Sequence, residues 1–329
     1  MSLASEIRCE LDPGELMRRV GEEPDSYQAD YLLSEEPRII LLESRQAGKS
    51  RTTATKCLHR AMYHERSLVL AIGAAQRQAD EVMQKAHELY SASPVVPLVG
   101  RPAERRMRFA NGSRFVSLPA SEATVRSFSG VKLLVLDEAA RIMDPLYASV
   151  RPFLAVSRGQ LVLLSSAFGK RGFFWEAWNK GLPAGWEEVY AKQHAARVEV
   201  VDGVPRLTRA LAPEERGRGW RLFNERVAAL GPVRSRWKRY LVTADDVPRI
   251  DDEFLQDELE AVGEWWLSQE YFARFHEAVG AMFAYDEIVQ ALSRGTDAFD
   301  FRPGDLDTAV GASVGRGRAF FGGGYEARR

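Results

Sequence analysis

Apolar side chains follow two alternating patterns along the first half of the chain. Short apolar runs at residues 38–42 and 68–72 are typical of buried strands. Apolar residues at helical spacing follow each run, beginning just after Gly48 in the first case and near Ala79 in the second. Strands that alternate with helices in this way predict an α/β fold with a mainly parallel sheet flanked by helices.

A hairpin and two further strands continue the pattern. Residues 106–118 place Asn111 and Gly112 between two partly alternating runs, which predicts a hairpin inserted in the α/β pattern. The runs at 133–136 and 161–164 predict two more buried strands, each ending in small or acidic polar residues. Because α/β folds carry their chemistry at the carboxyl ends of strands, we expect functional residues there.

The alternation of predicted strands and helices ends after residue 181. Beyond it, clusters of Pro, Gly and charged residues separate helical pieces at 220–230 and 253–275. From about residue 292 the chain is rich in Gly and Arg, and we expect a disordered tail. The predicted organisation is an N-terminal extension at 1–23, a core at 24–181, a smaller and mostly helical lid or linker subdomain at 182–275, and a connector with this tail at 276–329.

The composition narrows the class of protein. The 329 residues are 45% hydrophobic and 28% charged, as in globular proteins, and the net charge of −1 means that local patches must bind any polyanion. Cys9 and Cys57 lack metal-ligand spacing, which leaves disulfide scaffolds, zinc ribbons and CxxC redox chemistry without support. No uncharged apolar run approaches the roughly 18 residues of a membrane helix, so we expect a cytoplasmic protein.

Residues 43–50, ESRQAGKS, match the second half of a phosphate-binding loop between a strand and a helix. Gly48 allows backbone N–H groups to close around phosphates, Lys49 provides a charge for the β and γ phosphates, and Ser50 offers a Mg²⁺ ligand. Glu43 stands where the pattern has its first glycine. The loop predicts ATP and Mg²⁺ as ligands; the alternative is a chance GKS.

Side chains within and before this loop extend the predicted nucleotide site. Arg45 and Gln46 add donors inside the loop, and Tyr27 and Gln28 lie where a ring and an amide reach adenine. The alternative for Tyr27 and Gln28 is a helix face in solvent. The predicted ATP-binding residues are Gln28, Arg45, Gln46, Ala47, Gly48, Lys49, Ser50 and Arg51.

The run at 133–136 leads directly into Asp137 and Glu138, so a buried strand delivers two adjacent carboxylates. Asp137 is predicted to hold Mg²⁺ through its water shell. Glu138 is predicted to orient and deprotonate the water that attacks the γ-phosphate. An isolated acidic pair is more often a solvated turn, but its place after a buried strand and downstream of a phosphate loop favours the catalytic interpretation.

Two further features are candidates for coupling and catalysis. Ser165 and Ser166 end the next strand, where hydroxyls can sense the γ-phosphate; strand capping is the alternative. Arg126, shortly before the acidic pair, is a candidate arginine finger that neutralises charge in the transition state; a plain surface arginine is the alternative.

Taken together, these residues resemble the large terminase subunit of tailed bacteriophages and prophages. The resemblance covers about residues 24–290. It rests on Tyr27 and Gln28, SRQAGKS at 44–50, NGSRFVSLPAS at 111–121, TVRSFSG at 124–130 before LLVLDEAA, and SSAFGKRGFFWEAW at 165–178.

This resemblance implies a RecA-like P-loop ATPase core of the ASCE type with an inserted lid. It also implies a homo-oligomeric ring at the procapsid portal in the bacterial cytoplasm, with monomers possible in isolation. A small terminase subunit recruits the ring, which moves double-stranded DNA without sequence specificity. Arg126 corresponds to the family's candidate arginine finger, which can act on a neighbouring subunit's ATP.

The family's second half is a two-metal nuclease of ribonuclease H type. Asp305, Asp307 and Thr308 echo its first strand, but the acidic positions needed to complete a metal site do not follow, since Glu326 is the one acidic residue after them. We therefore expect an ATPase half without endonuclease activity, through truncation, frameshift or the choice of expressed fragment.

DNA contacts and rival functions stay open at this point. The basic residues at 216–239, interleaved with Trp220 and Trp237, predict either a phosphate-binding patch or a solvated helical face. A DEAD-like helicase is one rival, but helicases of that kind need two RecA-like cores. The other rival is an inactive, ATP-binding prophage remnant. The patch residues are Arg216, Arg218, Arg221, Arg226, Arg234, Arg236, Lys238 and Arg239.

Overall fold

The computed structural model of the chain describes residues 3–100, 105–121, 128–194, 197–201, 204–209 and 211–277. The chain divides into two compact units, Met1–Gly280 and Ala281–Arg329, and every described residue lies in the first. The predicted tail therefore falls outside the described residues.

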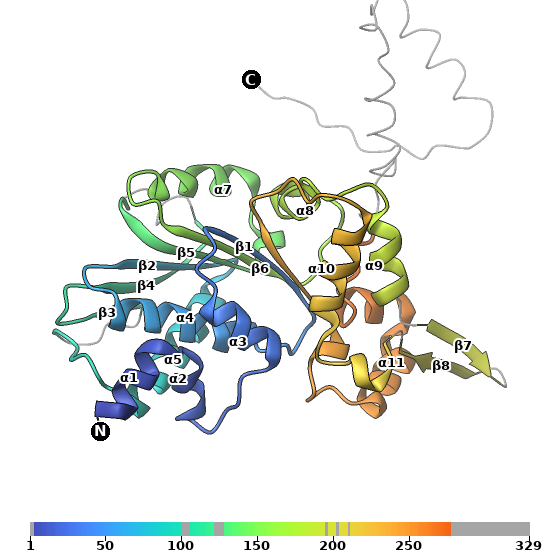
Figure 1. Cartoon of the computed structure of the whole chain (residues 1–329), viewed down its shortest axis with the longest axis horizontal. Coiled ribbons are helices and arrows are strands. Elements are labelled where there is room, and N and C mark those ends of the chain that lie inside the picture. Colours follow the sequence, from blue (N-terminus) through green and yellow to red (C-terminus); the bar gives the residue numbers. More distant parts are fainter. Residues whose placement is uncertain are drawn as a thin grey trace, which may run out of the picture. The chain divides into compact units, whose positions relative to one another are not determined.

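Seven strands form the central sheet in the order β3-β4-β2-β5-β6-β1-β9 (Figure 1). All neighbouring pairs are parallel except β3 with β4. The predicted mainly parallel α/β fold is confirmed. The strands are β1 (Arg38–Glu43), β2 (Leu68–Gly73), β3 (Arg106–Arg108), β4 (Arg114–Pro119), β5 (Val131–Asp137), β6 (Gln160–Ser165) and β9 (Lys238–Val242).

Helices cover both sides of the sheet, with α4 and α5 on one side and α7 and α8 on the other (Figure 1). The α-helices are α1 (Leu3–Leu11), α2 (Gly14–Arg18), α3 (Ser26–Leu33), α4 (Lys49–Tyr63), α5 (Gln76–Ala92), α7 (Asp144–Val150), α8 (Gly172–Asn179), α9 (Trp186–His194), α10 (Gly219–Leu230) and α11 (Asp252–Glu270). Short 3₁₀ turns are η1 (Ala139–Arg141), η2 (Arg151–Leu154), η3 (Pro213–Glu215) and η4 (Ala244–Asp246).

The two helical layers explain the continuous apolar runs in the sequence. In β1, Ile39 and Leu41 join the core cluster that includes α4 and α5, whereas Ile40 and Leu42 point to the opposite face and are equally buried. Cys9 and Cys57 are buried free thiols. Within the described residues, no helix combines the length and apolar character that a membrane crossing requires.

The predicted hairpin is present but is not an insertion. Gly112 adopts the left-handed conformation, with φ of 82°, between β3 and β4. β4 also pairs in parallel with β2, so the hairpin forms one edge of the sheet. The sequence predicted the turn because the signal for a turn is local. It did not predict the pairing of β4 with β2, because that pairing depends on a distant part of the chain.

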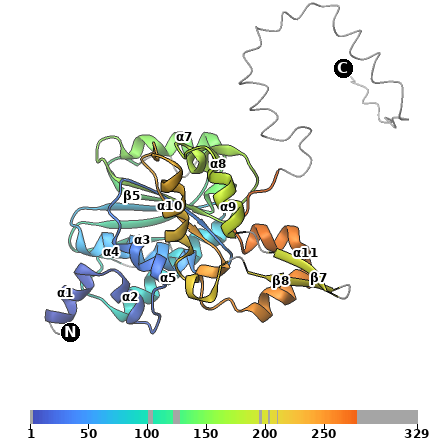
Figure 2. The ribbon, with the colours of Figure 1, turned by 45° about the vertical axis from the view of Figure 1, so that its right-hand side comes forward.

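The region at 182–275 contains the predicted helical pieces, as α10 and α11, and also strands that the sequence did not predict. It supplies β9, which extends the core sheet beyond β1, and an antiparallel hairpin of β7 (Arg197–Val201) and β8 (Val204–Thr208). This hairpin lies beside α11 in both views (Figure 1, Figure 2). β9 was missed because Arg239 interrupts its apolar pattern. Arg239 is nevertheless buried, since its guanidinium donates to the carbonyls of Trp178 and Lys180 at 2.7 Å.

A buried lysine holds α3 against α4. Lys56 is 4% exposed, and its ammonium donates to the carbonyl oxygens of Tyr31, Leu32 and Ser34 at 2.9–3.1 Å. These carbonyls lie at the carboxyl end of α3, where backbone donors run out. The Tyr31 carbonyl also accepts from the backbone N–H of Ser34, and the Ser34 carbonyl accepts from the Gln160 amide at 3.0 Å. The contact matters for function because α3 carries Tyr27 and Gln28.

Replacement of Lys56 by Met tests this anchor. We expect Lys56→Met to lower the free energy of unfolding by about 2 kcal/mol, because three hydrogen bonds between a buried ammonium and backbone carbonyls are lost. Denaturant unfolding measures the change. Lys85→Met is the control, since Lys85 on α5 forms a surface pair with Glu81 whose loss costs about 0.5 kcal/mol or less. Equal losses in the two variants would contradict the anchoring role.

Candidate active site

The predicted phosphate loop connects β1 to α4 and has the backbone geometry of an anion-binding turn. Gln46 and Gly48 adopt positive φ values of 59° and 89°, which turns the chain sharply before α4 begins at Lys49. A Cβ at Gly48 would lie 2.8 Å from Nε2 of Gln28, so the position also has no room for a larger residue. The loop therefore presents the amino end of a long helix, as phosphate binding requires.

Tyr27 and Gln28 lie beneath this loop. The Tyr27 hydroxyl and Nε2 of Gln28, the latter at 3.1 Å, donate to the carbonyl of Ala47. Oε1 of Gln28 accepts from the backbone N–H of Asp25 at 2.9 Å. Both side chains are almost fully buried. The ring of Tyr27 therefore supports the loop and is not open to stack on adenine, which differs from the prediction made from the sequence. Gln28 still lines the cavity beside the loop.

Lys49 and Glu138 face each other across the site. Nζ of Lys49 donates to the carbonyl of Ser44 at 2.9 Å and lies 4.0 Å from Oε1 of Glu138. Glu138 follows β5 with φ of 53°, a left-handed conformation that is unusual for a non-glycine residue and typical of functional sites. This turn separates the directions of Glu138 and Asp137, although the two are adjacent in sequence.

The predicted sensor serines contact the predicted catalytic carboxylate. The hydroxyls of Ser165 and Ser166 donate to Oε2 of Glu138 at 3.2 and 3.4 Å. Oγ of Ser165 also accepts from the backbone N–H of Ala140 at 3.3 Å. The end of β6 therefore orients Glu138 and joins it to η1.

Asp137 and Ser50 carry the kinds of oxygen atom that Mg²⁺ prefers as ligands. Asp137 is 3% exposed, and one carboxylate oxygen accepts from the backbone N–H of Glu138 at 2.9 Å. Burial and, next, the charge of Glu138 raise the pKa of Asp137 to about 7, an effect that a bound cation would oppose. Within the described residues no three His, Cys, Asp or Glu side chains gather around a metal, so phosphate oxygens and water would complete the coordination.

Glu43 introduces a third carboxyl group at the end of β1. Its side chain is 2% exposed, and its Oε2 has no hydrogen-bond partner among the described residues. Burial is the main cause that raises its pKa, to about 8; Lys49 opposes this effect, and Asp137 and Glu138 add to it. Glu43 is therefore mostly protonated at neutral pH, although the sequence suggested only a missing glycine.

A cavity of about 530 Å³ opens beside the loop, lined in part by Gln28, Gln46, Gly48 and Arg51. Its position makes it a candidate for the base and ribose of a nucleotide. Arg51 is held there by ion pairs to Glu22 at 2.9 Å and Glu88 at 3.0 Å.

Sequence reasoning missed two contacts that join distant segments to the loop. Arg249, which also lines the cavity, forms a bidentate pair with Asp25 at 2.8 and 2.9 Å. Arg45 pairs with Glu270 at 3.0 Å, and its backbone N–H donates to the Glu270 carbonyl at 2.6 Å. Each partner lies more than 200 residues away in sequence, so no local pattern reveals the pair.

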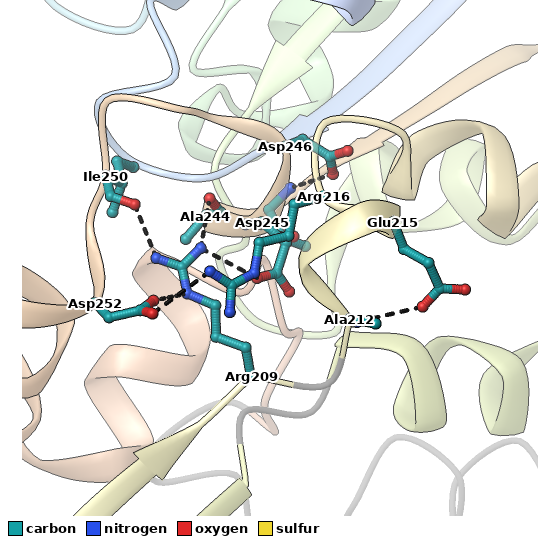
Figure 3. A network of polar contacts seen from close by, with 10 residues as sticks. Arg209, Ala212, Glu215, Arg216, Ala244, Asp245, Asp246, Ile250 and Asp252 are labelled. Atoms are coloured by element: carbon teal, nitrogen blue, oxygen red, sulfur yellow. Dashed lines mark hydrogen bonds and ion pairs between the residues drawn. The ribbon is translucent and has the colours of Figure 1, made fainter.

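A partly buried polar network holds the segment that carries Arg249 (Figure 3). The guanidinium of Arg209 donates to the carbonyl of Ile250 at 2.8 Å and contacts Asp245 at 3.1 Å and Asp252 at 2.5 Å. Arg216 reaches the same two carboxylates. The network fastens the end of β8 to the turn between β9 and α11, where Arg249 is placed.

The described residues include most, but not all, of the predicted site residues. Ser50 is partly exposed at the first turn of α4, as a Mg²⁺ ligand should be. The predicted finger, Arg126, lies outside the described residues, as do Asp305, Asp307 and Thr308.

The sequence of the chain matches the model of one known protein family. The family model "Terminase large subunit, T4likevirus-type, N-terminal" matches residues 40–290. No curated protein sequence gives a significant match.

Solved structures show the same fold. The ATPase domain of the Thermus phage P74-26 large terminase is similar, with a TM-score of 0.55 and 17% identity over 81% of this chain and 100% of that domain. The HK97 bacteriophage large terminase has a TM-score of 0.53 and 12% identity, over 84% of this chain and 56% of that one. The large terminase of the thermophilic bacteriophage D6E, in complex with ADP, has a TM-score of 0.50 and 11% identity, over 80% and 57%.

The buried carboxyl of Glu43 predicts a pH-dependent stability. Its pKa is higher in the folded chain, so folding retains a proton that the unfolded chain releases between pH 4.5 and about 8. Stability is therefore lost as pH rises through this window. We expect Glu43→Gln to remove this loss, so that the variant gains on the order of 2 kcal/mol relative to the parent across the window.

Urea unfolding at a series of pH values measures the difference. Glu65→Gln is the control, because Glu65 is exposed. Curves for Glu43→Gln that run parallel to those of the parent would show that Glu43 does not hold the proton.

Proposed function

We propose that this chain, which belongs to the phage large terminase family and represents its ATPase part, hydrolyses Mg²⁺-bound ATP to move double-stranded DNA into a procapsid. One observation supports hydrolysis above the others. Glu138 lies 4.0 Å from the phosphate-loop lysine, with its carboxylate oriented by Ser165 and Ser166. This is the arrangement of a base that faces a phosphate site.

Each residue has a defined part in the proposed reaction. The backbone around Gly48 and the Lys49 ammonium bind the β and γ phosphates, and Ser50 and Asp137 would hold Mg²⁺, which neutralises phosphate charge. Glu138 orients the attacking water and accepts its proton. Gln28, Arg45, Gln46, Ala47 and Arg51 complete the nucleotide site.

The serines can transmit a conformational change from the reaction site to other parts of the chain. Ser165 contacts both Glu138 and the backbone of Ala140, so loss of the γ-phosphate would change the position of η1 through one hydroxyl. Arg45 and Arg249 connect the nucleotide site to α11 and to the turn before it. We infer that these contacts carry the conformational change towards the segment at 182–275, which acts as the lid.

The assembly that uses this motion is inferred from the family. We propose a homo-oligomeric ring at the portal in the bacterial cytoplasm, recruited by a small terminase subunit, in which Arg126 acts as the arginine finger. The chain spans 56–57% of the HK97 and D6E large terminases, so packaging by a complete protein is itself part of the proposal.

We also propose that the chain does not cut DNA on its own. A two-metal nuclease needs clustered carboxylates, and the part of the chain that the structure describes offers no such cluster. Incubation of the purified chain with plasmid DNA and Mg²⁺ or Mn²⁺ tests this, and specific, metal-dependent cleavage would contradict it.

Two variants test the proposed hydrolysis. We expect Glu138→Gln to reduce the turnover of Mg²⁺-ATP by roughly 100-fold or more while a fluorescent ATP analogue still binds, because the base is lost and the phosphate site remains. Lys49→Ala should weaken binding itself. Glu65→Gln, an exposed change, should match the parent.

The assay is phosphate release with and without double-stranded DNA. Parent-like turnover by Glu138→Gln would exclude it as the base. Binding without turnover by the concentrated parent chain would favour an inactive remnant, and ATP-driven strand separation would favour a helicase.

A further inference from the structure

Two cavities of about 570 and 480 Å³ lie at the opposite end of the strands from the nucleotide site. They share Arg38, the first residue of β1, and Arg151, at the start of η2. The first extends to Arg158 before β6, and the second extends past α8 to the loop before β9. The two cavities thus follow the amino ends of three neighbouring strands.

The residues that line these cavities carry a strong excess of positive charge. Six cations line them against one carboxylate, Glu176. We call these six residues the Arg38 surface: Arg38, Arg151, Arg158, Lys180, Arg234 and Arg236. Five of them are exposed, and Arg38 is partly buried. Among the described residues, no ion pair neutralises any of the six.

This surface overlaps in part with the basic patch expected from the sequence. Within residues 216–239, Arg216 pairs with aspartates, Arg226 with Glu215 and Lys238 with Asp30, while Arg239 is buried. Arg234 and Arg236 instead join cations from β1, η2 and the end of α8. Folding therefore neutralises part of the predicted patch and assembles a different one.

Three of these cations, Arg38, Arg151 and Arg236, lie close enough for their charges to interact. Burial lowers the pKa of Arg38, and the charges of Arg151 and Arg236 lower it further. Tyr147 lies under the Arg151 guanidinium at 5.6 Å and stacks on Phe173. A cluster of like charges destabilises the folded chain unless an anion binds to it.

We propose that the Arg38 surface binds the phosphate backbone of double-stranded DNA. Guanidinium groups match phosphate oxygens and stay charged at all accessible pH values. An acidic protein segment fits less well, because protein interfaces depend on apolar anchors and the Tyr147 and Phe173 rings are already stacked on each other. The choice of duplex DNA rests on the proposed function, whereas the location of the surface does not.

This location separates the DNA contact from the chemistry. Phosphate contacts that touch no base position DNA without reading its sequence, as a motor requires. Because β1 ends in the phosphate loop and begins at Arg38, a single strand would link the nucleotide site to the DNA surface.

The test compares DNA binding by charge-removal variants of the whole chain. Arg151→Ala with Arg236→Ala removes two exposed cations, and Arg8→Ala with Arg77→Ala removes two exposed cations from α1 and α5 as the matched control. Fluorescence anisotropy of a labelled duplex gives Kd over a series of salt concentrations. We expect the first pair to weaken binding roughly tenfold and to lower the salt slope by about two, close to one per lost phosphate contact. The control pair should leave both unchanged.

Further arms separate the alternatives. Arg151→Lys with Arg236→Lys keeps the charge and should retain the slope. Unchanged Kd and slope in the alanine pair, or a parent chain that binds no duplex, would overturn the proposal. An alanine pair that loses poly-glutamate binding but keeps DNA binding would also overturn the proposal and would identify an acidic protein segment as the ligand. A loss of binding confined to single-stranded DNA would overturn it as well. ATP hydrolysis, measured in parallel, reports separately on the proposed function and should be unchanged in the alanine pair.

Discussion

The parallel pairing of β6 between β1 and β5 is the constraint on which the site depends. Leu42 pairs with Ser165 on one side of β6, and Asp137 pairs with Leu164 on the other. The phosphate loop, the serines and the acidic pair therefore leave the sheet at one level. A slip of one residue in either pairing would turn every side chain of that strand to the other face and would move these groups apart. Burial of both faces of the sheet fixes the register.

Burial also sets the charge state of the site. Glu43 and Asp137 are both nearly inaccessible, and desolvation raises the pKa of each towards or above neutrality. Lys49 is the nearby cation that limits this effect. A nucleotide with its metal would change the balance, because a divalent cation favours ionised Asp137. The nucleotide site therefore favours the binding of positive charge in addition to that of Lys49.

The features of the site that the sequence predicted are local. The loop, the acidic pair and the serines each follow an apolar strand, and periodicity identified those strands. Arg249 with Asp25 and Arg45 with Glu270 were not predictable, because each pair joins segments that only the folded chain brings together. β9 was missed for a related reason: Arg239 is satisfied by carbonyls of α8 and its C-terminal end, and nothing in its own segment indicates this.

A crystal structure of the chain with Mg²⁺ and ATPγS tests the central claim most directly. We expect the triphosphate around Gly48 and Lys49, the metal bound by Ser50 and on the side of Asp137, and a water held by Glu138 in line with the γ-phosphate. A nucleotide bound elsewhere would contradict it, as would a γ-phosphate and its water that Glu138 does not contact.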